Sequence, residues 1–334
     1  MSSVSKSAEL LSEFGGRLRA PLSADELVPP PRFNDKTFAN YEVGQPEQAA
    51  AVARVQSFAL AGPRRWWQWS RRDEQPGLYL DGDFGVGKTH LLAAAWHACR
   101  GPKRYLCFSD MISLAIILGH RGCVDLLASE LVCIDEFELD DPGNTRLADL
   151  VIDGLVARGS RIVVTSNTVP GELGHGRLFV DQFRRQLARV AAAFADVHVP
   201  GEDYRQRFRA EDESDPPGWG VAVEAFDRAD AAVLGAEELD KVLSDIPIAN
   251  LRRLAAALPR LTVRSMSRFE EQLPALRFVH LVDRLYDWQV PLRVQSDTAI
   301  RDLFSPEFRE LGFAKKYRRC CSRLVELCGE STPA

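Results

Sequence analysis

Short apolar runs alternate with longer stretches of helical periodicity between residues 77 and 199. The apolar runs read as strands at Leu78–Leu80, Arg104–Phe108, Leu131–Ile134, Arg161–Thr165 and Val197–Val199. The stretches between them read as helices at His90–Ala98, Met111–Leu118, Thr145–Ala157 and Asp181–Phe194. Strands that alternate with helices require crossover connections, and runs that are apolar throughout suit a sheet covered on both faces. The pattern therefore predicts an α/β domain with a parallel five-stranded sheet.

The remaining parts of the chain have different patterns. Residues 1–44 read as an N-terminal arm, and the Ala-rich stretch Gln45–Leu60 reads as the first helix of the α/β domain, which we place at residues 45–210. Charge and two prolines combine in the residues that follow, so we place a linker at 211–219. Beyond the linker, apolar residues recur with a helical period. We therefore expect a smaller, mainly helical C-terminal domain at residues 220–334.

The composition is that of an ordinary globular protein. Hydrophobic residues make up 46% of the 334 residues, and the formal net charge is −5. This mild balance argues against a surface coated for nucleic acid. The N-terminus lacks the apolar segment of a signal peptide, and no apolar run approaches the roughly 20 residues that span a bilayer. We therefore expect a cytoplasmic protein with no transmembrane segment and no stable nucleic-acid partner.

The loop between the first strand and the following helix carries the strongest chemical signal. Residues 82–89 read Gly-Asp-Phe-Gly-Val-Gly-Lys-Thr, which fits the P-loop pattern G-x-x-x-x-G-K-[ST] for a nucleoside triphosphate. In such a loop the glycines let backbone N–H groups point at phosphate oxygens, and the helix N-terminus adds positive charge. Lys88 would reach the β- and γ-phosphates, and the hydroxyl of Thr89 would bind Mg²⁺. The nucleotide-binding candidates are Gly82, Asp83, Phe84, Gly85, Val86, Gly87, Lys88, Thr89 and His90.

Acidic and polar residues follow two later strands of the predicted sheet. Asp135 and Glu136 come directly after the run at Leu131–Ile134, and Asn167 follows the next strand. Ligands of parallel α/β sheets bind at the carboxyl ends of the strands. We therefore predict that Asp135 holds Mg²⁺ with its water, and that Glu136 polarises the water that attacks the γ-phosphate. In a sheet where the strand before Asn167 lies beside the P-loop strand, Asn167 would contact that phosphate or that water, although an asparagine after a strand also serves as an ordinary turn residue.

Two groups of basic residues have more than one interpretation. Arginines before the last strand could neutralise transition-state charge in a neighbouring subunit, or form a solvated helix face: Arg177, Arg184, Arg185 and Arg189. We favour Arg184 or Arg185 for the catalytic role. The stretch at residues 64–72 is dense in tryptophan and arginine, and could stack bases, contact a membrane or bind a protein. We favour packing of its indole rings on the core, because exposed tryptophan is costly.

Several segments of the chain together resemble one known family. They are RFNDKTFANY (32–41), GLYLDGDFGVGKTHLLAAAWHA (77–98), LVCIDEFELDDPGNTRLADLV (131–151), VVTSNTVPGEL (163–173) and LVDRLYD (281–287). These segments are similar to the ZapE-type AAA+ ATPases, bacterial cell-division proteins with mitochondrial relatives, and most of all to their actinobacterial branch. The P-loop is shared by many ATPases, whereas DEFELDDPGNT and LVDRLYD are more specific. The resemblance covers most of the chain.

The resemblance implies a P-loop AAA+ core followed by a smaller helical domain, in an enzyme that hydrolyses ATP with magnesium. It assigns Asp135 and Glu136 to Mg²⁺ and hydrolysis, and Asn167 to sensing the γ-phosphate. It places Phe38 and Tyr41 on the adenine side of the nucleotide. It also implies a homo-oligomeric, hexameric ring that remodels or regulates a protein assembly at the division site, in contact with the tubulin-like division protein.

Two other functions stay open beside this one. The first is a nucleic-acid-directed ATPase, such as a helicase loader, that uses the stretch at residues 64–72. The second is a nucleotide switch that binds without hydrolysis. The net charge of −5 argues against the first, and the presence of Glu136 argues against the second. The stretch at residues 177–183 lacks the proline of many ZapE-type proteins, so the resemblance does not fix which arginine a neighbouring subunit donates.

Overall fold

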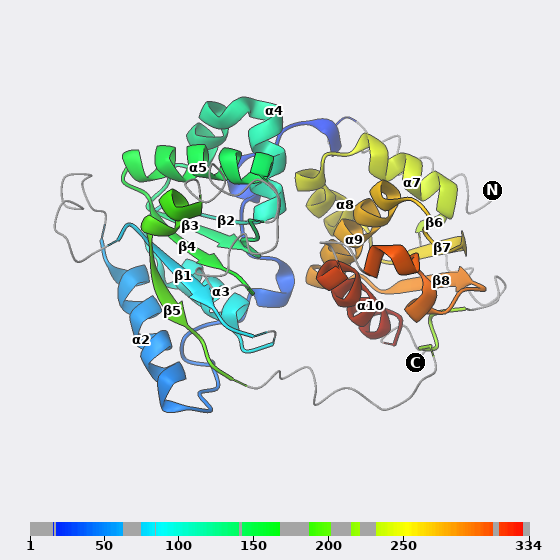
Figure 1. Cartoon of the computed structure of the whole chain (residues 1–334), viewed down its shortest axis with the longest axis horizontal. Coiled ribbons are helices and arrows are strands. Elements are labelled where there is room, and N and C mark those ends of the chain that lie inside the picture. The colour runs from blue at the N-terminus through cyan, green and yellow to red at the C-terminus, as the bar shows by residue number, and fades with distance from the viewer. Residues whose placement is uncertain are drawn as a thin grey trace. The chain divides into compact units, whose positions relative to one another are not determined.

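The computed structural model divides the chain into two compact units (Figure 1). One unit comprises residues 22–210, and the other comprises residues 1–21 together with 211–334, so the predicted N-terminal arm is divided between them. The described residues are 16–62, 75–139, 142–167, 187–201, 215–220, 232–309 and 314–329, without residues 17 and 84. The predictions for four parts of the chain lie outside the described residues: Phe84, the stretch at 64–72, Arg177, and the pair Arg184 and Arg185.

The first unit is built on a five-stranded sheet in which all strands run parallel. Its strands are β1 (Gly77–Asp81), β2 (Lys103–Cys107), β3 (Leu131–Asp135), β4 (Arg161–Thr165) and β5 (Phe194–His198). They lie in the order β2-β3-β4-β1-β5, so β4 is inserted between β3 and the strand that precedes the P-loop. The predicted α/β fold with a parallel five-stranded sheet is confirmed. The carboxyl ends of β3, β4 and β1 adjoin one another at one edge of the sheet.

Helices cover both faces of this sheet (Figure 1), which explains why its three inner strands, β3, β4 and β1, are buried along almost their whole length. They are α2 (Pro46–Leu60), α3 (Lys88–Ala98), α4 (Phe108–Leu127) and α5 (Pro142–Ala157). Leu78 and Leu80 of β1 belong to the apolar cluster of α2 and α3. Tyr79, between them, points to the opposite face, where its ring lies edge-on to those of Phe137 and Phe194.

The second unit contains a three-stranded parallel sheet, which the sequence pattern does not predict, among the helices that it does. The strands are β6 (Ala232–Gly235), β7 (Leu261–Met266) and β8 (Leu292–Ser296), in the order β6-β7-β8. The helices are α7 (Ala236–Asp245), α8 (Leu251–Ala257), α9 (Gln272–Asp287) and α10 (Ala314–Gly329). The expected helical C-terminal region is therefore present. Leu18 belongs to its core, and Asn250 donates to the carbonyl oxygens of Leu18 and Ala20, at 2.7 Å each.

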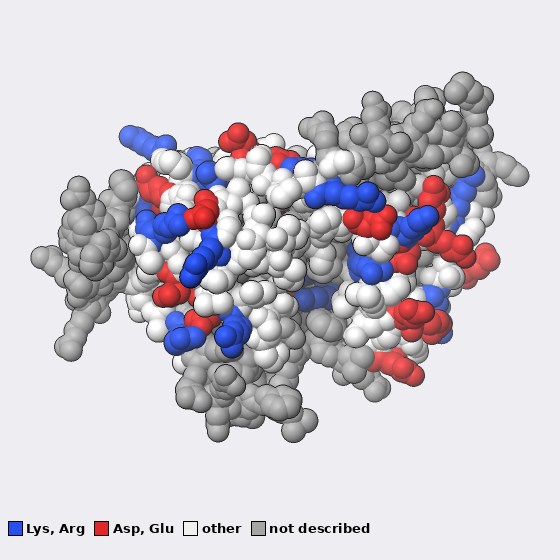
Figure 2. All heavy atoms as spheres, turned by 90° about the horizontal axis from the view of Figure 1, so that it is seen from above, with Lys and Arg blue, Asp and Glu red and all other residues white. Residues whose placement is uncertain are grey.

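Charged side chains of both signs are interspersed on the face of the molecule in Figure 2. Lysine and arginine lie next to aspartate and glutamate there, in keeping with the small net charge of −5. Among its described residues, this face therefore presents neither sign as a continuous surface. Within the described part of the chain, none of the helices has the length and apolar character needed to cross a membrane.

Candidate active site

The P-loop connects β1 to α3, and glycines shape it. Gly82 and Gly87 have φ angles of 139° and 93°, in the region that favours glycine. Space restricts both positions as well. A Cβ on Gly82 would lie 2.3 Å from the carbonyl oxygen of Val199, and one on Gly87 would lie 2.7 Å from the ring of Tyr41. Backbone conformation and close neighbours therefore both require glycine at these two positions.

Lys88 is the first residue of α3, and its ammonium group is held against the loop. The residue is 7% exposed, and Nζ donates to the carbonyl oxygens of Gly82, at 2.7 Å, and Asp83. A phosphate oxygen would be a stronger acceptor for this ammonium group than these carbonyl oxygens are. The loop therefore combines a positive charge with a helix N-terminus, which is what an anion site requires.

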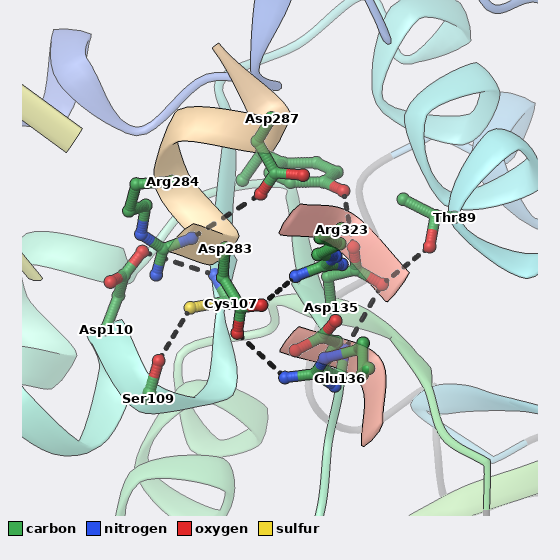
Figure 3. A network of polar contacts seen from close by, with 12 residues as sticks. Thr89, Cys107, Ser109, Asp110, Asp135, Glu136, Asp283, Arg284, Asp287 and Arg323 are labelled. Atoms are coloured by element: carbon green, nitrogen blue, oxygen red, sulfur yellow. Dashed lines mark hydrogen bonds and ion pairs between the residues drawn. The ribbon is translucent and has the colours of Figure 1, made fainter. Parts of the chain in front are cut away.

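The carboxylate of Asp135, at the end of β3, is surrounded by hydroxyl groups from other elements of the first unit. Thr89 of α3 donates to Oδ1 at 3.2 Å (Figure 3), and Tyr105 of β2 donates to Oδ2 at 3.1 Å. The hydroxyl of Thr165, at the end of β4, also donates to Oδ1. The contact between Thr89 and Asp135 joins the P-loop helix directly to this strand end.

The electrostatic surroundings of Asp135 favour a cation. Burial raises the pKa of this carboxyl, and the charge of Glu136 raises it further, whereas the three hydroxyl donors oppose the rise. The ionised carboxylate is therefore costly by itself, and a bound metal ion would relieve that cost. A carboxylate beside the Thr89 hydroxyl offers the hard oxygen ligands that Mg²⁺ takes, together with phosphate oxygens and water. In the described part of the chain, no group of three or more His, Cys, Asp or Glu side chains is placed to hold a metal ion.

Glu136 follows Asp135 in a strained backbone conformation. Its φ is 53°, in the left-handed region, which costs a non-glycine residue about 1 kcal/mol or more. Its N–H donates to Oδ1 of Asp135 at 3.2 Å and to Oγ1 of Thr165 at 3.0 Å, and these bonds offset the strain. The direction in which the Glu136 side chain leaves the end of β3 is therefore set by its backbone. Strain of this kind is typical of functional sites.

Asn167 lies just beyond the end of β4 and is half-buried. The residue before it, Ser166, donates its backbone N–H to the carbonyl oxygen of Leu80 at 2.9 Å, which ties this end of β4 to β1. The structure thus brings one group of predicted site residues to the same edge of the sheet: Lys88, Thr89, Asp135, Glu136 and Asn167.

Part of the predicted arm also contacts the P-loop. The hydroxyl of Tyr41 donates to the carbonyl oxygen of Val86 at 2.8 Å, and its ring lies edge-on to that of His90, with centroids 5.2 Å apart. Nε2 of His90 lies 2.9 Å from the carbonyl oxygen of Thr37, so this side chain is turned toward the arm. Phe38 packs, partly buried, against the apolar cluster of α2 and α3. Tyr41 therefore touches the loop itself, and His90 supports the segment that carries Tyr41.

Sequence reasoning missed Tyr105 and Thr165, which complete the hydrogen bonds around Asp135. A weak signal was present, because each carries a hydroxyl group on a strand that lies next to β3. Arg189 is the described member of the predicted arginine set. It is exposed and forms an ion pair with Asp149 of α5, so it has an acidic partner within its own chain.

This chain is similar to a known protein family, to individual protein sequences and to solved structures. The model of the AFG1-like ATPase family matches residues 21–258 and 249–332, and so spans both units. The cell division protein ZapE of Escherichia coli K12 is 24% identical over 311 residues, which cover 78% of this chain and 82% of that protein. The chromosomal replication initiator protein DnaA of Bordetella pertussis is 29% identical over 175 residues, 46% of this chain and 34% of that protein. Among solved structures, AMPPCP-bound DnaA from Aquifex aeolicus is 17% identical, with a TM-score of 0.37 over 53% of this chain and 52% of that chain.

Proposed function

The chain belongs to the AFG1-like ATPase family, and we propose that it hydrolyses ATP with Mg²⁺ at the sheet edge described above. The observation that carries the proposal is the contact between Thr89 and Asp135, at 3.2 Å between Oγ1 and Oδ1. It brings the end of the P-loop and a strand-end carboxylate within reach of one metal ion. Glu136, next in the chain, supplies a second carboxylate beside them.

Each residue at this edge has a distinct role in the proposed reaction. The backbone N–H groups of the loop and the ammonium group of Lys88 bind and orient the phosphates. Thr89 and Asp135 hold Mg²⁺, which neutralises phosphate charge when bound. Glu136 orients the attacking water and draws its proton, and Asn167 contacts the γ-phosphate or that water.

The variant Glu136→Gln separates nucleotide binding from turnover. The amide keeps the size of the side chain but is not a base, so we expect ATP affinity close to wild type and turnover slower by about a hundredfold or more. Glu47→Gln, at an exposed position of α2, is the matched control and should leave both quantities unchanged. Turnover that survives in Glu136→Gln would refute the role of this carboxylate. Removal of magnesium with a chelator should stop turnover in the wild type.

We infer that the active form is a homo-oligomeric ring, hexameric as the ZapE resemblance implies, in which a neighbouring subunit donates Arg184 or Arg185. The rate per subunit should then rise with protein concentration. Mixing subunits gives a sharper test. Glu136→Gln subunits and Arg184→Ala/Arg185→Ala subunits, each inactive alone, should regain turnover together, because an intact arginine can serve an intact Glu136 across a mixed interface. No recovery in rings of verified mixed composition would refute an arginine supplied in trans.

Cell division is the biological setting that we propose. The relative from Escherichia coli, whose match covers most of both chains, is named a cell division protein. The resemblance adds contact with the tubulin-like division protein, and we propose that the ATPase remodels or regulates that assembly in the cytoplasm, at the division site. Glu136→Gln with ATP is the appropriate bait, because it should retain its client in the ATP state. Division proteins recovered with this variant and not with Lys88→Ala would support the proposal, and equal recovery with both would contradict it.

A nucleic-acid-directed ATPase, such as a helicase loader, is the second candidate. The similarity to a replication initiator protein is the observation that favours it. DNA should then stimulate turnover, and substitution of Trp66 and Trp67 should remove the stimulation. Turnover that neither single-stranded nor double-stranded DNA changes would eliminate this candidate.

A further inference from the structure

Gln48, in the first turn of α2, joins three segments of the chain near the P-loop. The residue is 1% exposed. Its Oε1 accepts the backbone N–H groups of Gly44 and Gln45, at 2.6 Å and 3.2 Å. Its Nε2 donates at 2.7 Å to the carbonyl oxygen of Pro200, in the stretch 199–201 that follows β5 and that we call the exit segment. The position requires a side chain of this length that both donates and accepts, because an apolar or ionised side chain lacks a donor, an acceptor or both.

The exit segment rests directly on the P-loop. The carbonyl oxygen of Val199 lies so close to Gly82 that a Cβ there would approach it to 2.3 Å. A Cβ on Gly201 would lie 3.3 Å from Cγ1 of Val86 and 2.8 Å from Nε2 of Gln48. The exit segment therefore contacts the loop at its start and near its end, and Gln48 holds this segment in place.

We propose that Gln48 is a positioning residue for nucleotide binding, which keeps the P-loop in its phosphate-binding shape by holding the exit segment against Gly82 and Val86. This inference rests on the proposed function, because it takes the loop as the ATP site. A loop that is already held in its binding shape loses less conformational freedom when it binds the phosphates, so its affinity for the nucleotide is higher. Tyr41 holds the same loop from the arm, through the carbonyl oxygen of Val86.

The variant Gln48→Glu tests the proposal through a pH profile. A neutral glutamic acid reproduces the amide, since its O–H donates to Pro200 and its C=O accepts from the two N–H groups. The ionised form has no donor and repels the carbonyl oxygen of Pro200. Burial and the carbonyl oxygen of Pro200 raise the pKa of a glutamate at this position, whereas the two N–H donors and the helix N-terminus lower it, so the pKa of the new carboxyl in the variant is first measured by titration. We expect affinity for a fluorescent ATP analogue with Mg²⁺ to match wild type below that pKa and to be about tenfold weaker above it.

Two further variants make the profile specific to this position. Gln56→Glu, at an exposed position of the same helix, should show a constant ratio to wild type across the pH range. Gln48→Leu should bind weakly at every pH. Titratable groups that directly adjoin these segments along the chain are Glu47, Asp81, Asp83, His198 and Glu202, and all are present in every protein compared. Their effects therefore cancel in the ratio of variant to wild type.

The outcomes separate this inference from the proposed function. A wild type that binds no nucleotide, or that binds it equally well as Lys88→Ala, would overturn both. A wild type that binds, together with a constant Gln48→Glu ratio, would overturn only the role of Gln48. The unfolding temperature of each variant, measured without nucleotide, must lie above the assay temperature at both ends of the pH range. Wild-type affinity of Gln48→Glu at low pH would itself show that this variant is folded. A stable Gln48→Leu with wild-type affinity would also contradict the proposal.

Discussion

The hydroxyl of Thr165 donates a hydrogen bond to Oδ1 of Asp135 across the adjoining ends of β4 and β3. The same hydroxyl accepts the backbone N–H of Glu136 at 3.0 Å. One side chain therefore orients both of the acidic residues to which we assign metal binding and hydrolysis. Its own position is set by the register of β4 against β1, in which Thr165 lies opposite Leu80.

Thr165→Val tests this arrangement, because valine has nearly the same shape as threonine and no hydroxyl. We expect kcat to fall by about tenfold to a hundredfold, with a much smaller change in ATP affinity, because the loop and Lys88 are untouched. Thr165→Ser keeps the hydroxyl and should retain most of the activity. Steady-state ATPase assays, with thermal unfolding to check the fold, measure both variants. A wild-type kcat in Thr165→Val would show that the hydroxyl does not orient Glu136.

Lys88→Ala removes the ammonium group from the P-loop. We expect ATP affinity to fall by about a hundredfold or more, because a charge-assisted contact to phosphate is lost. The matched control is Lys103→Ala, beyond the other end of α3, where Nζ donates to the carbonyl oxygen of Cys99 at 2.8 Å and lies 4.3 Å from the ring centroid of Trp96. That substitution should lower stability and leave affinity unchanged in a calorimetric titration. Equal losses of affinity would mean that Lys88 acts only by stabilising the helix.

Tyr41→Phe removes one hydroxyl from the segment that contacts the loop. We expect about fivefold weaker ATP affinity, because the carbonyl oxygen of Val86 loses its donor. Tyr41→Ala should weaken binding further, because the ring that packs against Gly87 is also lost. Tyr286→Phe is the control, since its hydroxyl donates to Glu326 in the other unit, and it should leave affinity unchanged. Wild-type affinity in Tyr41→Ala would exclude this segment from the nucleotide site.

The strand ends were predictable from the sequence, but their arrangement in the sheet was not. Asp135 and Asn167 follow apolar runs, so local pattern alone placed them at carboxyl ends of strands. The order of strands in a sheet does not follow from local periodicity. The prediction for Asn167 depended on β4 lying next to β1, and the structure has this order.

What the sequence did not predict depends on contacts between distant segments. Tyr105 reaches Asp135 because β2 and β3 pair in a register that places Cys107 opposite Asp135, and no pattern along the chain encodes that register. Gln48 lies in a helix that was predicted, but its partner Pro200 is far away in sequence. The sheet of the second unit was not predicted, because the longer helical segments around its strands dominate the local pattern.

A buried carboxylate in the second unit makes stability depend on pH. Asp283 of α9 lies between Arg319, at 2.8 Å, and Arg323 of α10, and Figure 3 shows its pair with Arg323. Burial alone would raise the pKa of Asp283, but the two guanidinium groups outweigh burial and hold the pKa well below its ordinary value. Because the pKa of Asp283 is lower in the folded state than in the unfolded state, its ionised form stabilises the folded state at pH values above the unfolded pKa of about 4. This stabilisation is lost as the pH falls below that value.

Asp283→Asn should therefore destabilise the protein in a way that depends on pH. Near neutral pH we expect a loss of about 3–5 kcal/mol, or roughly 10 °C in Tm, because two buried guanidinium groups lose this carboxylate. Asp240→Asn, in the more exposed pair with Arg277, is the control and should cost less than about 1 kcal/mol. Thermal denaturation followed by circular dichroism should show the gap between Asp283→Asn and wild type narrowing below about pH 4. A gap that stays constant would mean that the loss comes from packing, because the contribution of the Asp283 charge changes with pH and that of its packing does not.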